Sequence, residues 1–394
     1  MSTASTEDRT PILLVTDEME VGGTQRQIVN LALGLDRRVF EVTVAYFRNP
    51  SILIDELRVA GIRVVEVAKR GRVDPFFVLQ LAKLIREGRF AVVHAFAFSG
   101  ELWAAAARCL IAPSRRPALI TSVRGVYEWY RPWQWRVKRW VSRGSWRVVA
   151  NSRAGAEYAC RRLGLPHGAI DVIYNGVTLP AAQEAAAVRD ETGCGAQSVM
   201  ALFVGRLIDH KNLPVLLRAM ALLRDELPPL KLAIAGDGPL RQDTERQIAQ
   251  LQLSDSVRML GERDDVPRLL AAADFLVLPS YREGLSNALL EAMHAGKPSV
   301  ASAVGGNVEL IEPGLTGLLF RSDDERDLAG AMRSLALDPG LRARIGAAAR
   351  EAAQQRFSVA AMVREFELRY RQCVAEKASA ARDLQPSAER RHAR

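Results

Sequence analysis

Short hydrophobic runs alternate with longer amphipathic stretches along most of the chain. In the first half, the hydrophobic runs occupy residues 12–16, 42–46, 64–67, 92–94, 119–122, 148–150 and 172–174. After an interruption they continue at residues 199–204, 232–235, 257–260, 275–278, 299–301 and 318–320. Runs of this length, separated by segments long enough for a helix, are typical of parallel strands in βα units. The pattern therefore predicts an α/β protein with two doubly wound parallel sheets.

The alternation is interrupted at residues 176–196, where a proline, a group of alanines and several glycines replace the hydrophobic runs. A chain of 394 residues also exceeds the size at which one hydrophobic core keeps growing. We therefore predict two domains, residues 1–177 and residues 178–357. Residues 358–376 are predicted to form a C-terminal helix that returns to the first domain, and the polar residues 377–394 a mobile tail.

The composition excludes several classes of protein. Hydrophobic residues make up 48% and charged residues 25% of the chain, as in an ordinary globular protein. The chain has no apolar run of membrane-spanning length and a polar start, so we expect a cytoplasmic protein. The net charge of +9 favours an anionic partner without choosing among phosphates, anionic lipid and nucleic acid. The cysteines form no C-x-x-C pair, which argues against a zinc site; they are Cys109, Cys160, Cys194 and Cys373.

A basic loop follows the predicted strand at 199–204 and begins with Gly205 and Arg206. In open α/β sheets, ligands bind outside the carboxyl ends of the strands. Gly205 would let a ligand approach the backbone, while Arg206 and Lys211 would supply cations at the entrance to a helix. This combination suits a diphosphate, although a solvated basic loop would have the same composition.

A second candidate segment follows the predicted strand at 275–278. Ser286 is predicted to cap a helix, so that the backbone N–H groups near residues 285–288 face an anion. Glu283 precedes this helix. Glu291 lies about one turn inside it, where its carboxylate would accept hydrogen bonds from ribose hydroxyls; a solvated surface position is the alternative for an isolated glutamate.

The order and spacing of these segments resemble a known family across almost the whole chain. Residues 279–293 read P-S-x-x-E-G-x-x-x-x-x-L-E-A-M, which places Glu283 and Glu291 in an E-x7-E motif. The chain is thus similar to retaining glycosyltransferases of family 4 type, whose GT-B fold has two facing Rossmann-like domains with a cleft between them. Further matches to this family are Gly296-Lys297-Pro298, Gly305-Gly306, Glu309 and Thr316-Gly317.

The resemblance implies roles for individual residues in the donor site. Arg206 and Lys211 would bind the diphosphate of the donor, and Glu291 the ribose. Glu283 would hold the transferred sugar together with the backbone of the residues that follow it, namely Gly284, Leu285, Ser286 and Asn287. The remaining expected donor contacts are glycines, at Gly22, Gly23, Gly205, Gly236 and Gly238.

The resemblance also implies a role for His94 near the donor sugar, although a lone histidine after a strand is more often structural. The expected catalytic residues are therefore His94, Glu283, Arg206 and Lys211.

The mechanism implied by the resemblance is transfer with retention of anomeric configuration. Arg206, Lys211 and a helix N-terminus would stabilise the departing diphosphate. The chain contains no Asp-x-Asp sequence, so we expect neither a metal nor another cofactor. The resemblance implies a front-face mechanism, in which the leaving phosphate helps to deprotonate the acceptor. Whether Glu283 acts as a nucleophile or only positions the sugar stays open. A UDP-sugar is the favoured donor, with a GDP-sugar as the alternative.

Five of the six tryptophans lie between residues 129 and 146, interleaved with arginines. A helix starting near Trp133 would place Trp133 and Trp140 on one face, beside a basic stripe that includes Arg136 and Arg143. Such a helix suits an anionic membrane surface, and a core helix covered by arginine stems is the alternative. Together with Arg124, these residues are expected on the acceptor or membrane side.

The expected partners are a nucleotide-sugar donor, a glycan or lipid-linked acceptor and an anionic surface at the cytoplasmic face of a membrane. Nucleic acid is not expected, because no nucleic-acid motif accompanies the basic stripe. Two other functions stay open: a sugar-nucleotide epimerase of the same fold, and a non-catalytic membrane-surface adaptor. The E-x7-E segment disfavours the epimerase, and the intact donor residues disfavour the adaptor.

Overall fold

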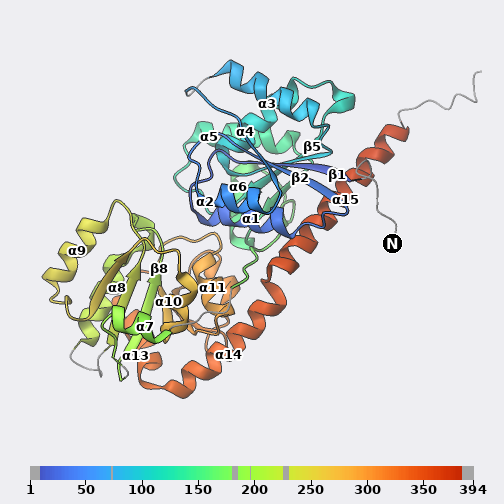
Figure 1. Ribbon diagram of the computed structural model, residues 1–394. Coiled ribbons are helices and arrows are strands. Elements are labelled where there is room, and N and C mark those ends of the chain that lie inside the picture. Colours follow the sequence, from blue (N-terminus) through green and yellow to red (C-terminus); the bar gives the residue numbers. More distant parts are fainter. Residues whose placement is uncertain (1–8, 72–73, 180–184, 196, 225–229, 384–394) are drawn as a thin grey trace, which may run out of the picture. The chain divides into compact units, whose positions relative to one another are not determined.

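The computed structural model describes residues 9–71, 74–179, 185–195, 197–224 and 230–383. The described chain forms two compact units. The first contains the residues up to Asn151, Ala156–Ile173 and those from Met362 onward; the second contains Ser152–Gly155 and Tyr174–Ala361. Each unit is built around one parallel sheet (Figure 1).

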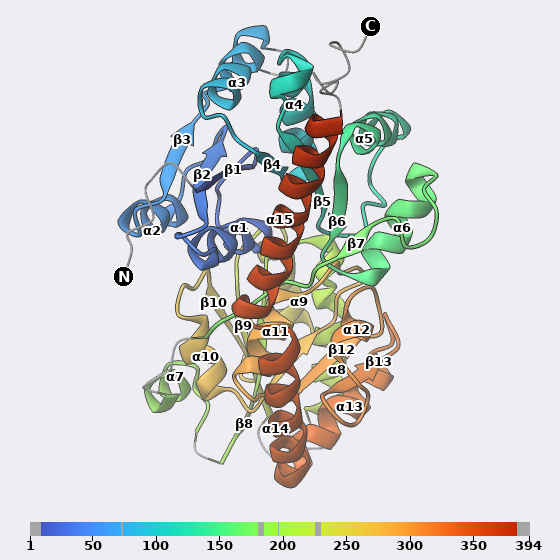
Figure 2. The same ribbon diagram turned by 90° about the vertical axis from the view of Figure 1, so that its right-hand side faces the viewer.

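The first unit has a seven-stranded parallel sheet in the order β3-β2-β1-β4-β5-β6-β7. Its strands are β1 (Thr10–Val15), β2 (Phe40–Tyr46), β3 (Arg63–Glu66), β4 (Val92–Ala95), β5 (Ala118–Val123), β6 (Arg147–Ala150) and β7 (Asp171–Val172). Its helices are α1 (Gly23–Gly34), α2 (Ile52–Val59), α3 (Pro75–Glu87), α4 (Ala97–Cys109), α5 (Pro132–Gly144), α6 (Arg153–Leu163) and α15 (Val359–Asp383). Helices α3 and α4 cover one face of this sheet, and α1 and α15 cover the other (Figure 2).

The second unit has a six-stranded parallel sheet in the order β10-β9-β8-β11-β12-β13. Its strands are β8 (Val199–Val204), β9 (Leu230–Ala235), β10 (Val257–Gly261), β11 (Phe275–Leu278), β12 (Ser299–Ser302) and β13 (Leu318–Phe320). Its helices are α7 (Ala185–Glu191), α8 (Leu213–Leu223), α9 (Arg241–Gln250), α10 (Val266–Ala272), α11 (Asn287–His294), α12 (Asn307–Leu310), α13 (Glu325–Leu337) and α14 (Pro339–Arg356).

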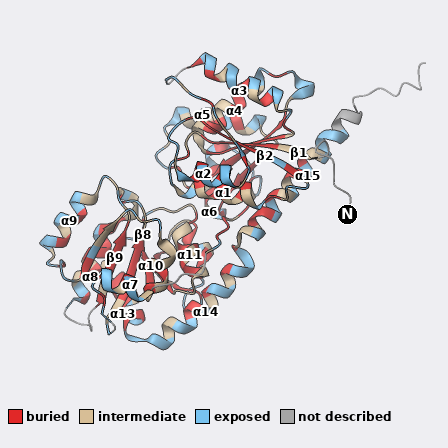
Figure 3. Ribbon diagram, in the orientation of Figure 1, coloured by how far each residue is buried: buried red, intermediate tan, exposed pale blue. Residues whose placement is uncertain are grey.

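Every strand predicted from the hydrophobic runs is present, with small shifts at the ends. The strands are the most buried elements of both units, while the helices are exposed on their outer faces (Figure 3). Strands that are covered on both faces have continuous hydrophobic runs, which explains why the runs located them well. Among the helices in the described ranges, none combines the length and the apolar character needed to cross a membrane.

The predicted domain boundary after residue 177 lies slightly too late. The structure assigns the chain from Tyr174 onward to the second unit. Hydrogen bonds explain this assignment: the backbone N–H of Val177 donates to the carbonyl of Phe357 at 3.0 Å, and Asn175 donates to the side chain of Asn287 at 2.8 Å.

The predicted end of the last helix at residue 376 is also wrong, because α15 continues to Asp383. Side chains near that point bind the first unit. Trp146 donates to the carboxylate of Glu376 at 2.7 Å, and the ammonium group of Lys377 donates to the carbonyl of Arg116. The rest of the predicted tail, residues 384–394, lies outside the described residues.

Candidate functional site

The sheet of the second unit reverses its strand order between β8 and β11. In doubly wound sheets, such a switch point opens a crevice at the carboxyl ends of the strands, and ligands bind there. The two loops that follow these strands carry the predicted donor residues. The topology therefore brings both candidate segments to one edge of one sheet.

An ion pair joins these two loops. The ammonium nitrogen of Lys211, after β8, lies 2.6 Å from Oε1 of Glu283, after β11. The hydroxyl of Ser280 donates to the same carboxylate oxygen at 2.7 Å. The side chains of Lys211 and Glu283 are only 15% and 10% exposed. Since an ammonium group has three N–H donors, Lys211 keeps donors for a phosphate while it is bound to Glu283.

Backbone geometry fixes Lys211 in this position. It ends a short 3-10 helix, Asp209–Lys211, and the next residue, Asn212, is buried and left-handed with φ 50°. The backbone N–H of Tyr281 donates to the carbonyl of His210 at 2.8 Å, which ties the β8 loop to the β11 loop a second time. Arg206, by contrast, is exposed on the same loop.

Two glycines after β12 support the backbone of Glu283 from behind. A Cβ atom on Gly305 would lie 2.0 Å from the carbonyl oxygen of Glu283, and one on Gly306 would lie 2.0 Å from that of Gly284. Gly305 also has a left-handed φ of 49°, which favours glycine. The Gly305-Gly306 pair is thus required by the close approach of two backbones.

The turn after β9 has a similar structural requirement. A Cβ on Gly236 would lie 1.9 Å from the carbonyl oxygen of Gly205, and one on Gly238 would lie 2.5 Å from that of Leu207. The carboxylate of Asp237 accepts from the backbone N–H of Gly238 at 2.6 Å and holds this turn. Packing against the β8 loop therefore accounts for both glycines, and their contact with a nucleotide stays a prediction.

Helix α11 begins as predicted. Ser286 is its N-cap, and the serine hydroxyl accepts a hydrogen bond from the backbone N–H of Leu289 at 3.3 Å. Leu285 is buried beside the cap, while Gly284 and Asn287 are half-buried. Glu291 lies one turn further along α11 and is also half-buried. The first turn of α11 thus follows directly after the Lys211–Glu283 pair.

In the first unit, the switch point lies between β1 and β4. Gly22 and Gly23 follow β1 there, with Gly22 as the N-cap of α1. A Cβ on Gly22 would lie 2.7 Å from the side-chain oxygen of Gln25, a flexible group that would have to shift. The glycine loop is present where the sequence predicted it, and its ligand contacts stay a prediction.

The predicted role of His94 at the donor sugar is contradicted by the structure. His94 lies inside the first unit with no exposed surface. Its Nδ1 is 2.8 Å from the hydroxyl of Tyr370 on α15, and its Nε2 is 2.8 Å from the hydroxyl of Ser122 on β5. Burial, helped by the nearby charge of Arg124, lowers the pKa of His94 well below its usual value of 6.5. With both ring nitrogens occupied, His94 is a structural histidine.

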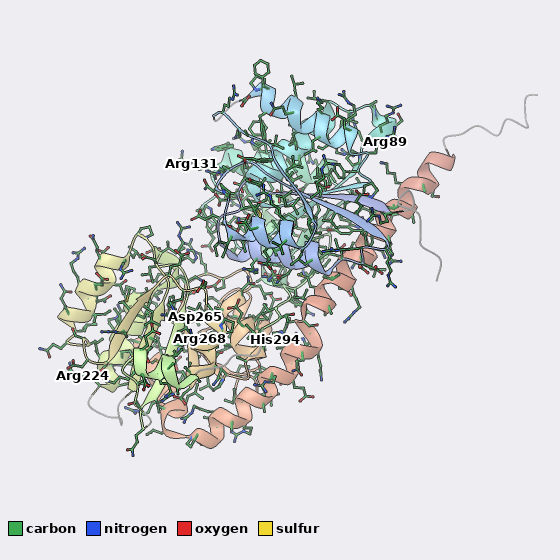
Figure 4. The ribbon with its side chains drawn as sticks, in the orientation of Figure 1. Arg89, Arg131, Arg224, Asp265, Arg268 and His294 are labelled. Atoms are coloured by element: carbon green, nitrogen blue, oxygen red, sulfur yellow. The ribbon has the colours of Figure 1, made fainter. Side chains whose placement is uncertain are left out.

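The tryptophan-rich segment forms helix α5, as predicted. Trp133 and Trp140 are 51% and 49% exposed, and Arg136 and Arg143 are exposed with them. These four residues, at spacings of three and four, form what we call the α5 face. Arg131, labelled in Figure 4, is the N-cap of this helix.

The opposite side of α5 fits the alternative of a core helix, and it contains an ion pair that the sequence analysis missed. Trp135, Lys138 and Val141 are buried there. The ammonium group of Lys138 lies 2.5 Å from the carboxylate of Glu101 on α4, and both side chains are almost completely buried. The spacing of Lys138 from Trp135 and Val141 was the signal for its burial.

Within the described part of the chain, no three His, Cys, Asp or Glu side chains lie close enough together to hold a metal ion. The arrangement seen in the second unit is instead a cation, a carboxylate and a helix N-terminus at one switch point. Such a set binds anionic and hydroxyl-bearing groups. Fold and site together define a protein of two Rossmann-like units.

Comparison with known proteins gives the class. A family model described as Glycosyltransferase Family 4 matches residues 21–179, and one described as Glycosyl transferases group 1 matches residues 187–352. The chain belongs to the GT-B glycosyltransferase superfamily.

Individual relatives agree with this assignment. A D-inositol 3-phosphate glycosyltransferase of Streptomyces avermitilis is 33% identical over 52% of this chain and 47% of its own length. The putative glycosyltransferase EpsF of Bacillus subtilis is 28% identical over 79% of this chain and 83% of its own. The crystal structure of Anabaena Alr3699/HepE in complex with UDP-glucose is 25% identical, with a TM-score of 0.80, over 94% of this chain and 100% of that one. The chain spans about half the length of the D-inositol 3-phosphate glycosyltransferases that it matches.

The buried state of His94 predicts acid sensitivity. The unfolded histidine takes up a proton near pH 6.5 but the folded one does not, so stability is present above that pH and is lost as the pH falls. Between about pH 7 and about pH 5, the free energy of unfolding should fall by about 2 kcal/mol more in the wild type than in His94→Gln. Urea denaturation at a series of pH values measures this difference. Equal pH dependence in the two proteins would contradict it.

The packing of Gly305 predicts a large cost for a single methyl group. Gly305→Ala should destabilise the protein by about 1–3 kcal/mol more than Gly314→Ala, because the added Cβ meets the Glu283 backbone. Gly314 is a matched control: it also has a positive φ, of 78°, but nothing lies within 4 Å of its Cβ position. Chemical denaturation of both variants checks this. Similar losses would show that backbone conformation alone is responsible.

Proposed function

We propose that this protein is a retaining glycosyltransferase that moves a hexosyl group from a UDP-sugar to a glycan or lipid-linked acceptor. The observation that carries the proposal is the Lys211–Glu283 pair at the switch point of the second unit, beside the N-terminus of α11. The related Anabaena structure holds UDP-glucose, which supports UDP over GDP as the nucleotide of the donor. Polysaccharide or glycolipid biosynthesis is the proposed role.

In the proposed reaction, the bond between the anomeric carbon and the donor phosphate breaks, and charge gathers on the departing diphosphate. Lys211, Arg206 and the α11 N-terminus stabilise that charge without metal or cofactor. The leaving phosphate accepts the proton of the acceptor hydroxyl, which attacks the same face of the sugar. Glu291 on α11 holds the ribose.

The contacts of Glu283 favour a positioning role over a nucleophilic one. Its Oε1 accepts hydrogen bonds from both Lys211 and Ser280, and these bonds withdraw electron density from the carboxylate. A carboxylate held in this way is a weaker nucleophile, but its other oxygen suits a hydroxyl of the transferred sugar. The intact pair also favours the transferase over the non-catalytic adaptor and the epimerase.

The donor site is tested by calorimetric titration with UDP and GDP in EDTA. UDP should bind, and Lys211→Ala and Glu291→Ala should each weaken binding about tenfold or more, because each removes a charged hydrogen bond. Lys231→Ala and Glu351→Ala are matched controls; Lys231 lies at the amino end of β9 and Glu351 on α14. Unchanged UDP affinity in both site variants would refute the donor assignment, and binding that requires a divalent cation would refute metal independence.

We further propose that the α5 face binds an anionic membrane surface on the cytoplasmic side. Its tryptophans offer rings with an apolar body and a polar edge, and its arginines offer charges for lipid phosphates. Peripheral binding of this kind needs no spanning helix.

Vesicle sedimentation tests this surface. The protein should bind vesicles of phosphatidylglycerol and phosphatidylcholine but not vesicles of phosphatidylcholine alone. The Arg136→Gln, Arg143→Gln double variant should bind about tenfold or more weakly, since each basic residue near an anionic surface contributes about 1 kcal/mol. Arg86→Gln with Arg89→Gln removes two exposed charges at the end of α3 and should bind as the wild type does. Arg89 is labelled in Figure 4. Equal loss in both double variants would mean that only net charge matters.

A further inference from the structure

Arg124 stands at the carboxyl end of β5, beside β4 in the sheet of the first unit. Its backbone N–H donates to the phenolic oxygen of Tyr127 at 2.7 Å, which fixes the start of the loop after β5. Its guanidinium carbon lies 5.8 Å from the centre of the Phe96 ring, at the end of β4. Arg124 is therefore held at the edge of the sheet where α/β proteins bind ligands.

The guanidinium group of Arg124 has one buried nitrogen that lacks a hydrogen-bond partner. Its Nε is buried without a hydrogen-bond acceptor, and among the residues that the structure describes no carboxylate forms an ion pair with it. Burial lowers the pKa of Arg124 to about 10, so the side chain is still charged at neutral pH. Although Nε is buried, the residue as a whole is only half-buried. An unpaired, desolvated charge costs stability, which indicates selection for a ligand.

An aromatic wall extends from Arg124 toward the surface. Tyr127 stacks on Tyr130 with ring centres 4.6 Å apart, Phe98 lies 5.4 Å from Tyr130, and Trp133 lies 5.7 Å from Phe98. The wall is thus formed by the loop after β5 and the starts of α4 and α5, and it ends at an exposed tryptophan. Aromatic rings offer flat apolar surfaces for the C–H face of a sugar, and few polar groups then fix its orientation.

We propose that Arg124 binds a phosphate group of the acceptor, and that the aromatic wall packs against the sugar which carries this phosphate. The planar guanidinium fork matches two phosphate oxygens, as in other arginine–phosphate pairs. This inference rests on the proposed glycosyltransferase function, and it identifies the acceptor as a phosphorylated sugar rather than a neutral glycan.

The test uses the whole protein saturated with UDP, so that the donor site is occupied. Glucose 1-phosphate is titrated in, and intrinsic tryptophan fluorescence reports binding through Trp133 and Trp129 beside the wall. The wild type should give a saturable change with glucose 1-phosphate but a much weaker one with glucose or glucuronate. Arg124→Met should weaken glucose 1-phosphate binding about tenfold or more, with Arg124→Lys in between. Arg86→Gln, which removes an exposed charge at the end of α3, should bind as the wild type does.

Wild-type affinity in Arg124→Met, or equal binding of glucose and glucose 1-phosphate, would overturn the inference. Equally tight binding of glucuronate would overturn the assignment to phosphate. UDP affinity, measured separately, should be unchanged in Arg124→Met. If UDP fails to bind the wild type, the proposed function fails; if UDP binds and glucose 1-phosphate does not, only this inference fails.

Thermal unfolding distinguishes the ligand role from a structural one. Arg124→Met replaces a desolvated charge with an apolar side chain of similar length, so its melting temperature should equal or exceed that of the wild type. A lower melting temperature together with normal glucose 1-phosphate binding would assign Arg124 to the fold instead.

Discussion

The ion pair between Lys211 and Glu283 is the contact on which the arrangement of the second unit's site depends. It joins the loops after the two strands that flank the switch point, and each partner would otherwise be a desolvated, uncompensated charge. The glycines at 305 and 306 allow the backbone of Glu283 to lie where the pair can form, and those at 236 and 238 allow the β8 loop to do the same. Four loops thus meet through one salt bridge, one backbone hydrogen bond and two pairs of close backbone approaches.

The fold was predictable from the sequence because its signals are local. A parallel strand buried on both faces needs a continuous hydrophobic run, and each run in the sequence became a strand. The N-cap of α11 was equally local, since a serine before a helical pattern satisfies a backbone N–H within the same turn. The E-x7-E segment predicted the positions of Glu283 and Glu291, because both lie in one continuous segment, the loop after β11 and helix α11.

Contacts between distant parts of the chain were not predictable in this way. The position of His94 after a strand led to the prediction of a histidine in the cleft. The partner of its Nδ1, Tyr370, lies far along the chain, and no local pattern links the two residues. The glycine pair after β12 matched a family motif. Its structural reason is that carbonyl oxygens of another loop lie too close to leave room for a Cβ atom. Lys138 lies on the apolar side of α5, which is a local signal for its burial, but nothing local indicates its partner, Glu101 on α4.

Two basic side chains at the ends of neighbouring strands respond differently to burial, and the difference distinguishes a structural group from one that can bind a ligand. His94 on β4 has a partner on each ring nitrogen and avoids the cost of burial by remaining neutral. Arg124 after β5 cannot lose its proton in this way near neutral pH, and its Nε has no acceptor. Only the second is left with an unmet requirement that a ligand can satisfy.

The packing of α15 also affects how the polypeptide is made. The ring of Tyr370 lies against Phe40, its hydroxyl forms a hydrogen bond with His94, and Glu367 accepts the backbone N–H of Asp36, so the sheet that contains β1 and β2 is completed by α15. During synthesis, the second unit emerges and is able to fold as a domain before that helix exists. Until then, the part of the first sheet that α15 packs on is uncovered and Nδ1 of His94 has no partner, so the first unit is completed only after the second has been made.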